Sequence, residues 1–127
     1  MLTWIFGEVK GSRVNILKAD KAAGFLELER ARVRWFLSID NSDIPTDLKA
    51  SGKRTYRSIT VNGEEIEFSG GFTDLHTMAY EEILQGKGFG LEAARNSIEI
   101  VYNIRNTEPL GLKGEYHPII KSIKNDL

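Results

Sequence analysis

Residues 70–105, GGFTDLHTMAYEEILQGKGFGLEAARNSIEIVYNIR, decide the fold, because two helical patterns lie next to each other there. In both patterns apolar residues recur at three- and four-residue spacing, which places their side chains on one face of a helix. Thr73 is a suitable N-cap for the first helix, and the second runs from 91 to 105. The expected core-facing residues are Phe72, Leu75, Ala79 and Ile83 in the first helix and Leu91, Ala94, Ile98 and Val101 in the second.

The turn between these helices, Gly86-Lys87-Gly88-Phe89-Gly90, is rich in glycine. Dinucleotide-binding turns also contain several glycines, but they join a strand to a helix and seat a pyrophosphate at the helix N-terminus. This turn follows a helical pattern, so we predict a helix-to-helix connection in which Gly86 ends the first helix. No other part of the 127 residues has the form of a dinucleotide-binding turn, and we expect no cofactor-binding residue in this chain.

Before the helices the sequence predicts strands. Asn62-Gly63 separates two alternating segments within residues 55–68 and supplies the positive φ angles of a type I′ turn, which predicts a β-hairpin. Three earlier segments also alternate between apolar and polar side chains, at residues 8–20, 23–29 and 32–40. Hairpin-linked strands followed by helices predict an α+β fold, with an open, mainly antiparallel sheet and helices on one face.

The third predicted strand carries large apolar side chains on both faces, Trp35 on one and Phe36 on the other. The sheet face without helices therefore needs a second layer, and a second copy of the chain would supply it. We expect a homo-oligomer, a dimer or a tetramer, formed through the open sheet face.

The two ends of the chain differ from its middle. Residues 1–7, MLTWIFG, are almost wholly apolar and have no N-cap, so we expect the last turns of a helix that begins outside this sequence. Residues 106–127 contain two prolines and two glycines and are expected to form an extended tail. Residues 1–127 are expected to be one, partial domain.

The composition excludes several classes of function. With 41% apolar and 28% charged residues, the chain has the balance of an ordinary globular domain, and no signal peptide or membrane span is indicated. Its net charge of −1 gives no electrostatic reason to bind nucleic acid or an anionic membrane. The absence of cysteine excludes disulfides and thiolate metal sites and is compatible with the cytoplasm. Two histidines far apart in sequence do not suggest a metal site.

Candidate ligand contacts occur at two places. Arg54, Tyr56 and Arg57 start the hairpin, directly after a long loop signal at residues 41–53. Arginine suits phosphate because its planar guanidinium donates two parallel hydrogen bonds. Strand alternation places Arg54 and Tyr56 on one face and Arg57 on the other, so a single regular strand does not direct all three to one ligand. The alternative is that they are exposed strand arginines beside a half-buried tyrosine.

Thr73 and His76 lie in the first turn of the predicted helix, where free backbone N–H groups and the positive end of the helix dipole favour an anion. His76 is of a type that can transfer a proton, but a local hydrogen bond explains it as well. We take Thr73 and His76 as candidate substrate contacts and predict no catalytic residue. His117, in the tail, either contributes to a site or packs with neighbouring aromatic residues.

Three stretches give the chain a wider resemblance: MLTWIFG at 1–7, FLELERARVRWFLSID at 25–40 and LKGEYHP at 112–118. In order and spacing they resemble the C-terminal half of the glucose–fructose oxidoreductase, inositol dehydrogenase and rhizopine catabolism (Gfo/Idh/MocA) family. The resemblance is closest to members that oxidise UDP-N-acetylglucosaminuronic acid in lipopolysaccharide O-antigen biosynthesis. It implies that NAD, the catalytic lysine and the active-site histidine belong to parts outside this sequence. It also implies a sugar site near Thr73 and oligomerisation through the sheet.

Three hypotheses follow. The favoured one is the substrate-binding and oligomerisation domain of a sugar-nucleotide dehydrogenase, inactive alone. The second is a free-standing, non-catalytic module that oligomerises or binds a ligand. The third is a small autonomous enzyme that uses His76 with Asp74.

Overall fold

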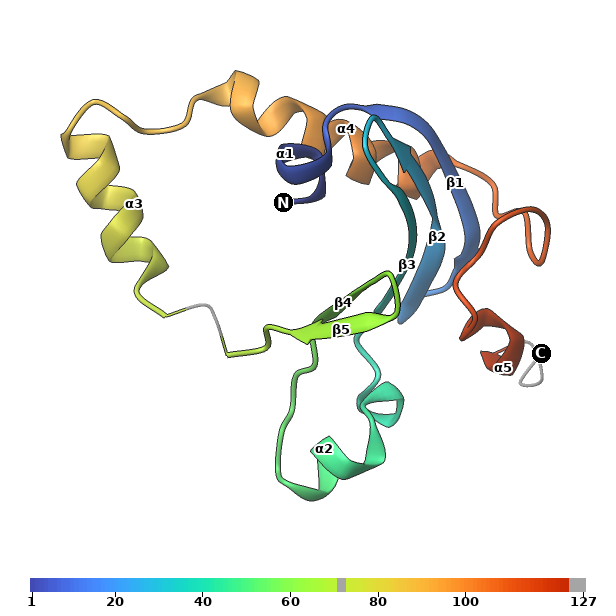
Figure 1. Cartoon of the computed structure of the whole chain (residues 1–127). Coiled ribbons are helices and arrows are strands. Elements are labelled where there is room, and N and C mark those ends of the chain that lie inside the picture. Colours follow the sequence, from blue (N-terminus) through green and yellow to red (C-terminus); the bar gives the residue numbers. More distant parts are fainter. Residues whose placement is uncertain (71–72, 124–127) are drawn as a thin grey trace. The chain divides into compact units, whose positions relative to one another are not determined.

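The computed structural model describes residues 1–70 and 73–123 (Figure 1). The chain forms two compact units, which we call the first unit (Met1–Ile39 with the residues from Gly90 onward) and the second unit (Asp40–Phe89). The sequence led us to expect one domain. The division falls where the long loop signal begins and at the glycine-rich turn, so the middle segment is an insertion with internal contacts of its own.

The first unit is built on an antiparallel sheet of three strands in the order β1-β2-β3. These are β1 (Val9–Leu17), β2 (Lys21–Leu28) and β3 (Arg32–Ser38). One backbone hydrogen bond closes each of the two turns between these strands. The amide of Lys18 donates to the carbonyl of Lys21, and the amide of Leu28 donates to the carbonyl of Ala31, both at 2.8 Å. The predicted α+β class with an antiparallel sheet is confirmed.

The core of this unit lies on both faces of β2, because successive residues of a strand point to opposite faces. Leu26 and Leu28 point to the same face as Trp35 of β3, and Ala23 and Phe25 point to the other. All five side chains are buried.

Helix α4 (Leu91–Asn106) packs against β1 with Ile100 and Ile104, which are its half-buried apolar residues. The stripe predicted as its core side is instead exposed: Leu91 by 88%, Ile98 by 66% and Val101 by 52%. The predicted orientation of α4 is therefore wrong. The helix carries two apolar stripes, and only the one at Ile100 and Ile104 meets the sheet.

The C-terminal segment runs without helix or strand from 107 to 119 and then forms α5 (Ile120–Ile123), whose two isoleucines are buried. Beside β1, the amide of Leu110 donates to the carbonyl of Val14 at 2.9 Å, and the amide of Gly111 donates to the carbonyl of Asn15 at 3.0 Å. The tail is thus tied to the sheet by backbone hydrogen bonds. Residues 124–127 lie outside the described residues.

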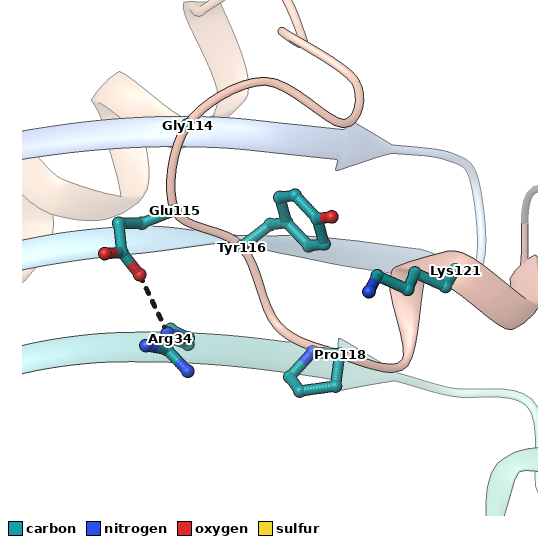
Figure 2. Close-up of a pocket in the computed structure, with 6 residues that line it drawn as sticks. All are labelled: Arg34, Gly114, Glu115, Tyr116, Pro118 and Lys121. Atoms are coloured by element: carbon teal, nitrogen blue, oxygen red, sulfur yellow. Dashed lines mark hydrogen bonds and ion pairs between the residues drawn. The ribbon is translucent and has the colours of Figure 1, made fainter.

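Side chains of the tail also reach the sheet. Glu115 accepts a hydrogen bond from Arg34 Nε at 3.0 Å (Figure 2). It accepts another from Arg32 Nη2 at 3.3 Å. The ring of His117 stacks on that of Phe36, with 5.9 Å between the centroids. Because Arg32, Arg34 and Phe36 share one face of β3, the chain's own tail covers part of that face.

Helix α1 (Leu2–Phe6) precedes the sheet. Arg30 holds it through two bonds, from Nη2 to the Ile5 carbonyl at 2.6 Å and from its backbone amide to the Phe6 carbonyl at 3.0 Å. No residue of α1 is buried, and Trp4 is 82% exposed.

The second unit begins with a short 3-10 turn, η1 (Asn41–Asp43), and a five-residue helix, α2 (Thr46–Ala50), within the segment that the sequence predicted as loop. The predicted hairpin follows as β4 (Ser58–Val61) and β5 (Glu64–Glu67). Asn62 and Gly63 have φ angles of 52° and 88°, as a type I′ turn requires, so the hairpin and its turn are confirmed.

Helix α3 (Leu75–Leu84) begins later than predicted, with Asp74 as its N-cap residue at a φ of 58°. Thr73 is therefore not the N-cap, because the chain turns through a left-handed residue immediately before the helix. Phe72, predicted on the apolar stripe of this helix, lies outside the described residues. The glycine-rich turn joins α3 to α4, with Gly86 at a φ of 73° directly after the helix, which confirms the helix-to-helix prediction.

We expect Gly63→Ala to destabilise the hairpin by about 1 kcal/mol, because a β-carbon strains the left-handed conformation while no neighbouring atom lies within 4 Å of its position. Amide exchange in β4 and β5 should become roughly fivefold faster. Gly70→Ala is the matched control, since Gly70 also has open space around it but no positive φ. Equal exchange in the two variants would contradict the turn assignment.

Candidate functional site

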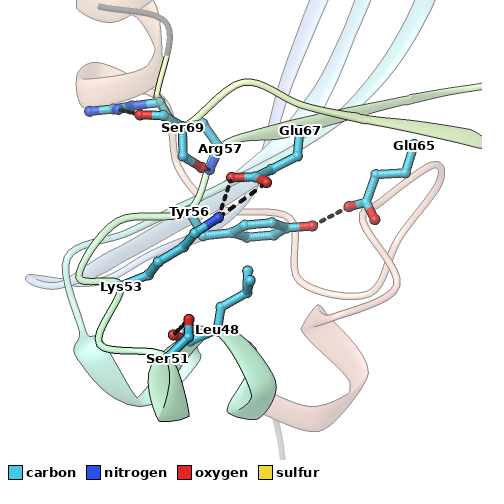
Figure 3. Close-up of polar contacts among 8 residues, drawn as sticks. All are labelled: Leu48, Ser51, Lys53, Tyr56, Arg57, Glu65, Glu67 and Ser69. Atoms are coloured by element: carbon cyan, nitrogen blue, oxygen red, sulfur yellow. Dashed lines mark hydrogen bonds and ion pairs between the residues drawn. The ribbon is translucent and has the colours of Figure 1, made fainter.

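All five predicted contact residues belong to the second unit. Tyr56 is half-buried at the start of the hairpin, and its hydroxyl donates a hydrogen bond to Glu65 of β5 (Figure 3). This bond raises the pKa of Tyr56 and lowers that of Glu65. On the same face, Lys53 Nζ lies 3.4 Å from Glu67 Oε1. The hairpin thus holds the end of the long loop through two carboxylates.

Arg57 lies on the opposite face, as alternation predicts. Its carbonyl accepts from the amide of Phe68 at 2.9 Å, which extends the β4–β5 ladder by one pair. Its amide donates to Ser69 Oγ at 2.8 Å, and its Nη1 donates to the Ser69 carbonyl at 3.4 Å. Arg54 precedes the strand and is exposed. The two arginines therefore lie in one short segment, but only Arg57 is held by backbone hydrogen bonds of the hairpin.

Thr73 and His76 are both exposed, and they flank the left-handed residue Asp74 at the start of α3. Residues 71 and 72, which separate them from Ser69, lie outside the described residues. The structure therefore places Tyr56 and Arg57 on opposite faces at the start of the hairpin, and Thr73 and His76 at the start of α3.

Sequence reasoning missed Lys53, Glu65 and Glu67. The signal was present, since the Asn62-Gly63 turn fixes the register and Glu65 and Glu67 alternate on the face of Tyr56. Glu67 pairs with the ammonium group of Lys53, and Glu65 accepts the hydrogen bond of Tyr56.

A pocket lies in the first unit, where the tail crosses the sheet (Figure 2). This pocket of about 340 Å³ is lined by Arg34, Gly114, Glu115, Tyr116, Pro118 and Lys121. None of the predicted contact residues lines it. An apolar cavity of about 390 Å³ lies between the end of β1 and the tail, with Leu17, Leu112 and Ile120 among its walls.

His117, beside the first of these pockets, packs as a tail residue. Its Nδ1 accepts a hydrogen bond from the amide of Ile119 at 3.3 Å, and its ring stacks on Phe36. Burial and the nearby charge of Arg34 lower the pKa of His117 below its usual 6.5. The neutral ring is thus the form that fits the folded tail.

This lowered pKa predicts a pH dependence. A depressed folded pKa means that the unfolded chain binds more protons, so stability should fall as the pH drops from about 6.5 towards the folded pKa of His117. His117→Phe keeps the stack and removes the titration, so it should flatten the slope measured by urea unfolding between about pH 7.5 and 5.5. An unchanged slope in this variant would show that another group causes it.

Among residues 1–70 and 73–123, no group of three or more histidine, cysteine, aspartate or glutamate side chains could hold a metal ion. The glycine-rich turn joins two helices, so it does not fit a dinucleotide pyrophosphate. In the same part of the chain, no helix is both long and apolar enough to cross a membrane.

The fold and the hairpin contacts together define a small α+β structure with arginines at a hairpin start and no nucleotide-binding turn of its own in the described residues. No protein-family model matches the chain. Among solved structures, two of the WlbA (WbpB) dehydrogenase from Thermus thermophilus are similar to it. One, in complex with NAD and alpha-ketoglutarate, is 50% identical with a TM-score of 0.86. The other, in complex with NAD and UDP-GlcNAcA, is 47% identical with a TM-score of 0.85.

Both alignments cover 93% of this chain but only 38% of the dehydrogenase chain. The chain therefore spans well under half of the length of these relatives. The similarity gives this chain a dehydrogenase relative and confirms that its fold occurs as part of such an enzyme.

Proposed function

We propose that the chain is the substrate-binding and oligomerisation part of an NAD-dependent sugar-nucleotide dehydrogenase. Its substrate would be of the UDP-N-acetylglucosaminuronate type, and its role would lie in the cytoplasmic synthesis of surface polysaccharide. The observation that carries the proposal is the 47% identity, over 93% of this chain, to a dehydrogenase whose structure contains NAD and UDP-GlcNAcA. Membership of the Gfo/Idh/MocA family is part of the same proposal.

In this proposal, NAD binds to the part of the dehydrogenase that the chain does not match. The matched part supplies sugar-nucleotide contacts and is inactive alone. When bound, NAD would accept the hydride from the sugar. The residues of this chain would bind and orient the substrate, without contributing a group to the hydride transfer.

The substrate contacts are proposed from charge and donor geometry. Arg54 and Arg57 would meet the diphosphate or the sugar carboxylate, because a guanidinium binds both bidentately. Thr73 and His76 would contact the sugar from the start of α3. Tyr56 would fix the hairpin through Glu65 and line the site with its ring.

The oligomerisation role concerns the sheet. Leu37 and Ile39, at the end of β3, are 64% and 84% exposed, so this edge of the first unit offers apolar area to a second copy. The proposed interface includes this area and the sheet face that the tail leaves uncovered.

Calorimetric titration of the purified chain tests the ligand assignment. UDP-GlcNAcA should release heat, and Arg54→Met together with Arg57→Met should weaken binding by about tenfold. Arg95→Met is the matched control, because Arg95 is also exposed but lies on α4 and pairs with Glu92 at 2.8 Å. Titration with NAD should release no heat. Heat from NAD, or equal losses in Arg95→Met, would contradict the proposal.

A further inference from the structure

Helix α4 carries an apolar stripe that the first unit does not use. The stripe consists of Leu91, Ala94, Ile98 and Val101, at spacings of three, four and three residues. We call it the α4 stripe. Its three large members are 52–88% exposed, while the sheet contact is made by Ile100 and Ile104 on another side of the helix.

The α4 stripe is not the solvent side of an ordinary surface helix. Such a helix has one apolar face towards the core and polar residues opposite to it. In α4 most polar residues occupy a third side, which is made up of Glu92, Arg95, Asn96, Glu99 and Asn103, while Arg105 follows Val101 at the end of the stripe. The three-four-three spacing of the stripe is the pattern with which a helix packs against another helix. This side of α4 therefore fits a second helical partner.

The size of the stripe helps to identify this partner. One apolar side chain per turn over three turns offers far less than the roughly 800 Å² per partner that separate, stably associated chains bury. Contacts between parts of one polypeptide need less area, because attachment keeps the partner at high local concentration. A second copy of the chain is thus a poorer occupant than a neighbouring part of the same enzyme.

The relatives contain such a neighbouring part. In the WlbA dehydrogenase the segment matched by this chain is 38% of a longer chain, and the structures of that chain hold NAD. We infer that the α4 stripe is the docking surface for the nucleotide-binding part of a WlbA-like dehydrogenase. This inference rests on the proposed function and assigns α4, rather than the sheet, to the contact between the two parts.

Thiol labelling can test this because the chain contains no cysteine. Ile98→Cys places a thiol on the α4 stripe, and Asn103→Cys places one on the polar side of the same helix. Each variant is prepared twice: as the isolated chain, and within a chimera in which this chain replaces the matched segment of the Thermus thermophilus WlbA dehydrogenase. Labelling at each position is followed by peptide mass spectrometry.

In the isolated chain both thiols should react quickly, at rates independent of protein concentration. In the chimera, labelling at position 98 should be at least about tenfold slower while labelling at position 103 is unchanged. NAD binding by the chimera verifies its folding. Because the proposed arginine contacts lie far from α4 in sequence, failure of the sugar-nucleotide titration would leave this result unaffected.

Three results would overturn the inference. Equal labelling at position 98 in the chain and the chimera would show that nothing docks there. Slow labelling in the isolated chain would show that the stripe is already covered, by a second copy if the rate depends on concentration. A chimera that does not fold would show that the α4 stripe does not fit the nucleotide-binding part.

Discussion

Replacing Gly24 by valine is expected to abolish folding of the first unit. Gly24 lies in the middle of β2, and a β-carbon at this position would overlap the carbonyl oxygen of Arg13 and come within 2.6 Å of Trp35 Cζ2. The first obstacle is the backbone of β1 and the second is a buried indole, so neither can move without opening the sheet. Gly24→Ala alone should cost more than about 3 kcal/mol, and valine more still.

Gly11→Ala is the matched control, because Gly11 also lies in the β1–β2 ladder. Its β-carbon would meet only the side chain of Glu27, at 3.5 Å, so the substitution should be neutral or slightly stabilising. Urea unfolding followed by the fluorescence of Trp35 distinguishes the two sites. Similar midpoints for Gly24→Ala and Gly11→Ala would contradict the packing described around Trp35.

The strands were predictable because their signals are local. Alternation fixed β2 and β3 to within about two residues, and Asn62-Gly63 determined the second hairpin through its positive φ angles alone. The helix-to-helix turn was predictable for the same reason, since Gly86 follows a helical pattern. Such features depend on residues within a few positions of each other.

The orientation of α4 was not predictable in this way. Both of its apolar stripes have helical spacing, and the sequence does not say which one meets the sheet. Tertiary contact with β1 selects Ile100 and Ile104 and leaves Ile98 exposed. The start of α3 was not predictable from local spacing either, because Asp74, in a left-handed conformation, is the N-cap residue instead of Thr73.

The candidate site was predictable only in part. Arginines and a tyrosine at a hairpin start can be recognised from residue type, and alternation correctly separated Tyr56 from Arg57. The hydrogen bond from Tyr56 to Glu65 could be predicted only with the register of β4 and β5 in hand. Whether these residues and those at the start of α3 bind one sugar nucleotide stays a prediction.

Asn15 had no sequence signal at all, although it is the buried polar residue on which the tail depends. It is 1% exposed, and its Nδ2 donates to the carbonyls of Gly111 at 2.8 Å and Lys113 at 3.2 Å. These partners lie 96 and 98 residues away, so no local pattern indicates them. An amide is needed here because both partners are acceptors.

Asn15→Asp should therefore destabilise the protein by about 3 kcal/mol or more at neutral pH, because a buried carboxylate would face two carbonyl oxygens without a donor. Burial should raise the pKa of the new carboxyl group above its unfolded value. A raised folded pKa means that the native state binds more protons, so the loss relative to the parent chain should shrink as the pH falls towards about 4.

Asn15→Leu is the matched variant, since it removes the same donors without adding a charge. Its loss relative to the parent chain should not depend on pH, and in both variants the amides of Leu110 and Gly111 should exchange faster as the tail separates from β1. Urea unfolding at about pH 7 and pH 5 gives the two differences. If Asn15→Asp and Asn15→Leu lose equal stability at both pH values, the amide of Asn15 does not hold the tail through those two carbonyls, and the tail must be held by Glu115 and His117 instead.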